Sequence, residues 1–241
     1  MVNEGVTLDS ILRGLRHSVR DLTLVVLGVL MALAANSWWE GRQEARVELV
    51  VLDAMMASLT TELASLNQSI ANLHDSESAI VFLRGQLAGS AQYSADLDAV
   101  FGRAYQVAGV TLPNPAPYEA LKSRGLQIVR EDSLRQQIID VYENVYARVR
   151  LANDINYNVM FDALRPYFLS HFRDLRFGQR ATPLDYAALA RDPYFDNLLA
   201  YRGDIIRGSL LVPYETAAEE VSRLLDAVEK RIETDGSRGA F

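Results

Sequence analysis

The chain has 241 residues, 49% of them apolar, and its 24 Lys and Arg against 31 Asp and Glu leave a net charge of −7. This length and apolar content suit a globular domain with its own core and exclude an intrinsically disordered chain. The acidic balance would repel a phosphate backbone and argues against nucleic-acid binding. The absence of cysteine excludes disulfides, thiolate nucleophiles and zinc–thiolate sites.

Residues 1–20 are predicted to form a cytoplasmic amphipathic segment on the inner membrane surface. Their basic side chains lie mostly off the apolar face of the helix, which is the pattern of a helix in the membrane interface. The apolar residues are Leu8, Ile11, Leu12, Leu15 and Val19, and the basic ones are Arg13, Arg16 and Arg20.

Residues 21–40 are predicted to form a transmembrane helix. Leu22–Ala35 contains Thr23 as its only polar side chain, and the segment extended to Trp39 has 18 residues. As a helix it is about 27 Å long, close to a hydrocarbon core of roughly 30 Å. Trp38 and Trp39 are expected to anchor one end at the headgroups, and Arg16 and Arg20 the other.

The arginine excess before this span predicts a cytoplasmic N-terminus and a periplasmic C-terminal domain, in a bacterial inner membrane. Two alternatives remain. Ala32-Leu33-Ala34 resembles a signal-peptide cleavage site, and an apolar helix of this length can also be the buried core helix of a soluble protein.

Small residues recur every four positions in the predicted membrane helix, at Gly28, Ala32 and Asn36. Such a stripe lets a helix of another integral-membrane protein approach closely, and Asn36 can hydrogen-bond across the contact. The alternative is the ordinary composition of membrane helices. No His, Asp or Glu lies between Leu22 and Trp39, which excludes an intramembrane proton relay or His-ligated cofactor on this chain.

Residues 41–234 are predicted to form a periplasmic α-helical domain. Its first helix continues from the anchor to about Leu87 and carries apolar residues at alternating spacings of three and four. This seam fits a homodimeric coiled coil or one helix of a bundle, and the amphipathic helices that follow favour the bundle. Its members are Leu49, Leu52, Met56, Leu59, Leu63, Leu66, Ile70 and Leu73.

Turn and cap residues divide the rest of the domain into further helices, so the predicted fold is all-α with no strand of consequence. Residues 168–177 are expected to be irregular and 235–241 to form a flexible tail. The first expected helices are Ser94 to about Val107, Tyr118–Arg124 stopped by Gly125, and one capped by Asp132 and bent or interrupted by Pro166. Thr182-Pro183 and Asp192-Pro193 are expected helix starts, and the last long stretch spans about Tyr194 to Glu233 with a bend near Pro213.

No pattern for catalysis, metal or nucleotide binding is present, so we expect a protein that is not an enzyme and has no cofactor. His17, His74 and His171 lie far apart without acidic residues at ligand spacing. Acids such as Glu62 and Asp75 are expected on solvated helix faces. An aromatic group can be core or line a ligand pocket, with core favoured; it consists of Tyr157, Phe161, Tyr167, Phe168, Phe172 and Phe177.

The most distinctive local string is YEALKSRG at Tyr118–Gly125, followed by DSLR at Asp132–Arg135. It predicts either a polar groove or, as favoured here, a structural corner in which Gly125 ends one helix, Asp132 starts the next, and Leu121 packs against Leu134.

Together with VVLGVLMALAANSWWEGRQE at Val25–Glu44, this string resembles a family of uncharacterised bacterial single-pass membrane proteins, over about residues 11–150. The resemblance implies the topology and the helical fold. It implies no activity and no catalytic residues.

Two functions are therefore expected from different classes. The first is a non-catalytic accessory subunit of a larger inner-membrane complex (respiratory, photosynthetic or secretory) that binds integral-membrane partners through its anchor and its helical domain. The second is a membrane-anchored periplasmic sensor or ligand-binding module. A homodimer through the heptad helix is the less favoured assembly.

Overall fold

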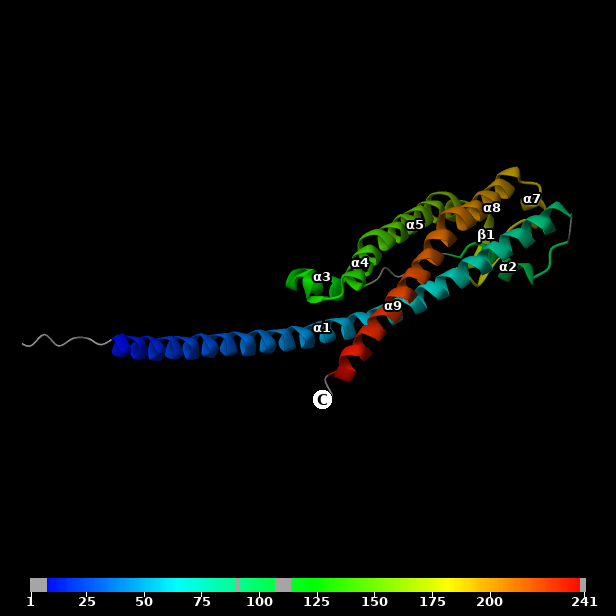
Figure 1. Cartoon of the computed structure of the whole chain (residues 1–241). Helices are drawn as coiled ribbons and strands as arrows, with labels where there is room; N and C mark the ends of the chain where they lie inside the picture. The colour runs from blue at the N-terminus through cyan, green and yellow to red at the C-terminus, as the bar shows by residue number, and fades with distance from the viewer. Residues whose placement is uncertain (1–7, 90–91, 107–113, 239–241) are drawn as a thin grey trace, which may run out of the picture. The chain divides into compact units, whose positions relative to one another are not determined.

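The computed structural model describes residues 8–89, 92–106 and 114–238, with side chains between residues 26 and 234 (Figure 1). The chain is 84% helical, which confirms the all-α prediction. Its contacts divide it into two units, Met1–Val50 and Val51–Phe241, and the second contains the hydrophobic core.

Three long helical runs make up most of the described chain. The first is α1 (Leu8–Ala88), which the heptad spacing predicted to about Leu87. The second joins α4 (Asp132–Ile139), η2 (Asp140–Val145), α5 (Tyr146–Asn158), η3 (Val159–Leu164) and α6 (Arg165–His171). The third joins α8 (Pro193–Ile205), η4 (Ile206–Leu211) and α9 (Val212–Arg238).

Within the second unit, α1 buries a seam with a strict seven-residue repeat. Leu52, Leu59, Leu66, Leu73 and Ile80 are at most 2% exposed. They pack into a core that also contains residues of α5, α8 and α9, so the seam belongs to an intramolecular bundle.

The other half of this seam differs from the prediction. The interleaved buried positions are Met55, Glu62, Ser69, Ser76 and Leu83, whereas Met56, Leu63 and Ile70 are only partly buried. The expectation that Glu62 lies on a solvated face is wrong, since this side chain is 8% exposed. Three successive positions on one side of the seam are therefore polar: Glu62, Ser69 and Ser76.

Two prolines lie in the interior of the long helical runs, and each comes shortly after a π-helical turn. Pro166 is in the first turn of α6 after η3, and Pro213 is in the first turn of α9 after η4. Proline has no backbone N–H and collides with the carbonyl four residues earlier. That carbonyl lies in the π-turn in both cases, where the wider hydrogen-bond spacing leaves room. The helical runs therefore continue through their prolines.

A short hairpin replaces the irregular segment expected at 168–177. Strands β1 (Phe172–Arg176) and β2 (Arg180–Pro183) pair antiparallel with an irregularity after Arg173. The prediction of a helix start at Thr182-Pro183 is wrong, because these residues end β2. The next helix, α7 (Tyr186–Leu189), is capped instead by Asp185, which accepts from the Ala188 N–H at 2.9 Å.

Helix α2 (Leu97–Ala104) packs closely against this hairpin. Gly102 makes the approach possible: a Cβ there would overlap the backbone nitrogen of Arg180, and the Gly102 carbonyl accepts from the Gly178 N–H at 3.1 Å. The helix is shorter than the Ser94–Val107 expected, and residues 107–113 lie outside the described part of the chain.

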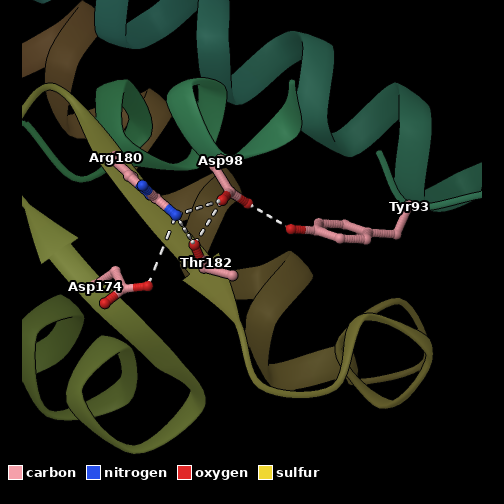
Figure 2. A network of polar contacts seen from close by, with 5 residues as sticks. All are labelled: Tyr93, Asp98, Asp174, Arg180 and Thr182. Atoms are coloured by element: carbon pink, nitrogen blue, oxygen red, sulfur yellow. Dashed lines mark hydrogen bonds and ion pairs between the residues drawn. The ribbon is translucent and has the colours of Figure 1, made fainter. Parts of the chain in front are cut away.

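A polar network centred on Asp98 of α2 fastens the hairpin (Figure 2). The buried Asp98 carboxylate accepts hydrogen bonds from Tyr93 at 2.7 Å and Thr182 at 2.5 Å. Arg180 lies between Asp98, at 3.6 Å, and Asp174, at 3.7 Å. The network joins α2 to both strands and explains the ordered position of two strands too short to be stable alone.

The remaining caps show how far turn residues predicted the boundaries. Asp192 caps α8 through the Tyr194 N–H at 2.9 Å, as predicted. Helix α3 (Ala116–Arg124) ends at Gly125, whose φ of 102° favours glycine, also as predicted. Helix α4 instead begins at Asp132, with Glu131 in the cap position. The backbone of α9 continues to Arg238, and residues 239–241 lie outside the description.

Candidate functional site

The most unusual interior feature of the second unit is a set of tyrosines around a buried carboxylate, here called the Glu62 cluster: Glu62, Tyr118, Tyr142 and Tyr146. Glu62 comes from α1, Tyr118 from α3, Tyr142 from η2 and Tyr146 from α5. All four side chains are at most 8% exposed.

The cluster is joined by hydrogen bonds and ring contacts. The hydroxyl of Tyr146 donates to one oxygen of Glu62, and that of Ser58 donates to the other at 2.8 Å. The Tyr142 ring stacks on Tyr118 with centroids 4.6 Å apart and meets Tyr146 edge-on at 5.3 Å. Among the described residues, the buried Tyr142 hydroxyl has no hydrogen-bond partner.

Burial sets the electrostatics of the cluster. It raises the pKa of Glu62 above its ordinary value, although hydrogen bonds from Tyr146, Ser58 and the Asn114 backbone oppose the shift. Burial and the nearby Glu62 carboxylate also raise the pKa values of Tyr142 and Tyr146. The tyrosines therefore remain protonated at neutral pH, and Tyr146 donates to Glu62, which suits a structural link between helices better than a general base.

The Tyr118–Gly125 string contributes Tyr118 to the Glu62 cluster, and its Lys122 lies at the rim. Glu143 accepts from the Tyr118 hydroxyl at 2.9 Å and from Lys122 Nζ at 3.1 Å. These two hydrogen bonds lower the pKa of Glu143, while burial and Glu143 raise that of Tyr118 to about 12.

The corner interpretation of this string agrees with the contacts around it. Leu121 and Leu134 are at most 2% exposed, and Arg135 donates to the Val129 carbonyl at 2.9 Å. The string does not form an isolated polar groove, because its tyrosine points into the Glu62 cluster.

The predicted anchor is apolar and uncovered within the first unit. Every side chain from Val26 to Glu40 is exposed, and Trp38 and Trp39 are 61% and 63% exposed. By length and composition, α1 is apolar enough to cross a membrane near the N-terminus of the chain. The core helix of a soluble protein and a signal sequence meet the same criterion. A core helix, however, is mostly buried.

The predicted packing stripe lies open on this helix. A Cβ at Gly28 would meet nothing within 4 Å, and Ala32 is exposed. Asn36 donates to Glu40 at 2.8 Å, and Arg42 lies 5.1 Å from the Trp38 ring centroid. The amide of Asn36 is thus satisfied within its own helix. The side chains of Arg16 and Arg20 lie outside the described part.

The histidines stay apart among the described residues, where no group of three metal-ligating side chains occurs. His74 contacts Glu77 and Glu215 on the surface. His171 stacks on Tyr167 at 4.0 Å, and its Nδ1 lies 2.9 Å from both the Ser170 hydroxyl and the Tyr167 carbonyl.

The aromatic group divides in two. Tyr167, Phe168 and Phe172 belong to the core, as favoured, where they contact Phe101, Tyr105 and Phe195. The other three are partly exposed on the surface: Tyr157, Phe161 and Phe177.

A further buried polar group escaped the sequence analysis. Asn153, Asn156 and Arg202 are at most 6% exposed, on α5 and α8. Two features of the sequence could have indicated this burial. Asn153 lies seven residues after the buried Tyr146 on the same helix, and Arg202 lies within the apolar run LLAYRGDII.

Comparison with known proteins agrees with the resemblance seen in the sequence. Residues 21–164 match the model of DUF6090, a family of unknown function. Since the match covers more than half of the chain, the protein belongs to this family. No curated protein and no solved structure matches. The matched range contains the exposed apolar segment of α1 and all four residues of the Glu62 cluster.

Proposed function

We propose that this protein is a non-catalytic accessory subunit of a larger protein complex in a bacterial inner membrane. Its N-terminus is cytoplasmic, α1 crosses the bilayer, and the helical bundle lies in the periplasm. The observation that carries the proposal is the exposure of the apolar side chains between Val26 and Trp39. Exposing so long an apolar surface to water is unfavourable, so lipid or another membrane helix covers it.

The interior of the bundle supports a role in binding rather than catalysis. The carboxylate of the Glu62 cluster is engaged by hydroxyl donors, and its tyrosines hold their protons more tightly than usual. These hydrogen bonds join helices to each other, and the protonated tyrosines provide neither a nucleophile nor a base near neutral pH.

Topology is tested with reporters in cells. Alkaline phosphatase fused after Phe241 is expected to be active, and green fluorescent protein at the same position dark when exported through the general secretory route. The membrane fraction should retain the chain after alkaline extraction. A fusion that is active only in the cytoplasm, or a chain released by alkali, would contradict the proposal.

Membership of a complex is tested by purification from native membranes in mild detergent, followed by mass spectrometry. The same membrane proteins should copurify in stoichiometric amounts. A matched control replaces Val26–Ala35 with an unrelated Leu/Ala segment of equal length, so that insertion is kept and helix recognition is lost. A wild-type chain that migrates alone at its own mass overturns the assignment.

The alternative, a periplasmic ligand-binding or sensor module, is favoured by the buried Arg202. Among the described residues it forms no ion pair with a carboxylate, although it is fully buried. A thermal-shift screen with small metabolites tests this alternative, because a binding module is stabilised by its ligand and a complete lack of stabilisation would count against it.

A further inference from the structure

Arg202 is a fully buried cation, with 0% of its side chain exposed. It projects from α8, one turn before the π-helical η4. Burial lowers its pKa to about 10, so the guanidinium remains charged at neutral pH. A buried charge without a counter-charge costs several kcal/mol and is rarely left unpaired.

Its partners in the described part of the chain are neutral. Nη1 donates to Oδ1 of Asn156 at 2.7 Å, and Nη2 donates to the Gln106 carbonyl at 3.3 Å. Nε, which carries one hydrogen, has no acceptor among these residues.

Tyr214, an ionisable residue that acts on the charge of Arg202, donates the hydrogen of its hydroxyl to Asn153. The segment that follows Gln106, residues 107–113, reads VAGVTLP and contains no acid. A counter-charge is therefore not provided by these side chains.

From this geometry we propose that Arg202 binds a small carboxylate anion inside the bundle. A guanidinium has five N–H donors in a planar fork, and a carboxylate accepts two of them side by side. The Nε–H is the donor that such an anion would satisfy. Asn156 holds the guanidinium, which makes it a positioning residue.

The position of the site fits a ligand-responsive element. Asn156 stands shortly before η3 and Arg202 shortly before η4, and α5 contacts both η4 and α9. Single π-helical turns within α-helices occur frequently at functional sites. The proposed site is separate from the membrane anchor, so it does not depend on the accessory-subunit proposal.

The test uses the full chain in detergent, dialysed into a zwitterionic buffer, with sodium acetate as the probe and sodium chloride at equal ionic strength as the reference salt. Thermal unfolding is followed by circular dichroism at the helix band. Wild type should be stabilised by acetate by a few degrees, saturably and beyond any effect of chloride. Arg202→Gln should lose this response. Arg207→Gln, which removes an exposed arginine five residues later, is the matched control and should keep it.

A second measurement tests the proposal if the anion stays bound through purification or if the Arg202→Gln variant does not fold. Organic acids released by denaturing the wild-type protein are quantified by mass spectrometry, and about one equivalent per chain is expected. Either an acetate-specific shift that requires Arg202 or a stoichiometric released acid supports the proposal. It is overturned if folded Arg202→Gln keeps the acetate response, or if no acid is released from wild type and acetate stabilises it no more than chloride does.

Discussion

Glu62 and Glu143 show how burial decides the behaviour of two carboxylates that bond to neighbouring tyrosines. Burial dominates at Glu62 and raises its pKa, despite the hydroxyl donors of Tyr146 and Ser58. Glu143 is exposed at the rim, and there the hydrogen bonds from Tyr118 and Lys122 dominate and lower its pKa. The pKa of the same chemical group is thus shifted in opposite directions at two sites that bond to tyrosines of the cluster.

We predict that these residues have opposite effects on the pH dependence of stability. Because the folded-state pKa of Glu62 is raised, its stabilising contribution is present below the unfolded pKa and lost as pH rises through the folded value. Glu62→Gln should therefore gain stability relative to wild type as pH increases from about 4 to 8. The pKa of Glu143 is lowered, so its contribution is present at neutral pH and lost as pH falls.

Urea unfolding at several pH values, with Glu143→Gln as the control, measures both effects. Glu143→Gln should be less stable than wild type at pH 7, and this difference should shrink on acidification. A stability difference between Glu62→Gln and wild type that does not change with pH would contradict the burial argument.

At Gly102, the absence of a Cβ atom allows α2 to pack against the hairpin. A Cβ at this position would overlap the Arg180 backbone, which cannot yield without moving the hairpin. We predict that Gly102→Ala destabilises the second unit by about 1–3 kcal/mol or more. Gly85→Ala is the control, because Gly85 is exposed on α1 and a Cβ added there would meet no other atom within 4 Å. It should stabilise by roughly 0.5–1 kcal/mol. Thermal unfolding of both variants checks the pair, and equal destabilisation would show that α2 and β2 do not approach closely.

At the scale of elements, the sequence predicted the helices well and the orientation of their faces only in part. In α1, apolar side chains at 52, 59, 66 and 73 indicated half of the seam, but the interleaved buried positions hold Glu62, Ser69 and Ser76. A pattern that counts apolar residues turns toward Met56, Leu63 and Ile70 instead. The burial of Glu62 depends on a hydrogen-bond donor that lies 84 positions away in the sequence, Tyr146.

The hairpin could not be predicted for a related reason. Its strands have five and four residues, are rich in arginine and do not alternate apolar with polar side chains. They are held by tertiary contacts with α2, above all at Gly102 and Asp98. Local propensity and periodicity contain no information about such contacts.

The observed phase of the seam leads to a prediction about two neighbouring leucines. Leu66 is 2% exposed, whereas Leu63 is only partly buried. Leu66→Ala should lower the free energy of unfolding by roughly 2–5 kcal/mol, because it leaves a cavity in the core. Leu63→Ala removes the same atoms from a half-exposed site and should cost clearly less. Chemical unfolding measures both, and a larger loss for Leu63→Ala would mean that the helix is rotated from the observed phase.

At the scale of the whole chain, the family match joins features that lie in different units. Residues 21–164 include the exposed apolar segment, the α1 seam and the Glu62 cluster, and end at Leu164, the last residue of η3. The hairpin, α8 and α9 lie outside that range. Under the proposed function, we expect contacts with other proteins on the exposed apolar segment and on the outer faces of the bundle, because the chain itself already fills the seam of the bundle.

We predict, finally, that the anchor recognises a partner helix as well as the bilayer. Gly28, Ala32 and Asn36 lie at four-residue intervals, and the space beside Gly28 is open. Leu at position 28 would hold an approaching backbone away while keeping the segment apolar enough to insert. The loss should be on the order of 1 kcal/mol, enough to reduce copurification of partners several-fold. Val29→Leu, next to the stripe, is the control and should retain them. Because Asn36 already bonds to Glu40, Asn36→Leu should weaken the contact less than Gly28→Leu does. Equal recovery of partners with Gly28→Leu and Val29→Leu, at equal amounts in the membrane fraction, would place recognition on the helical domain instead.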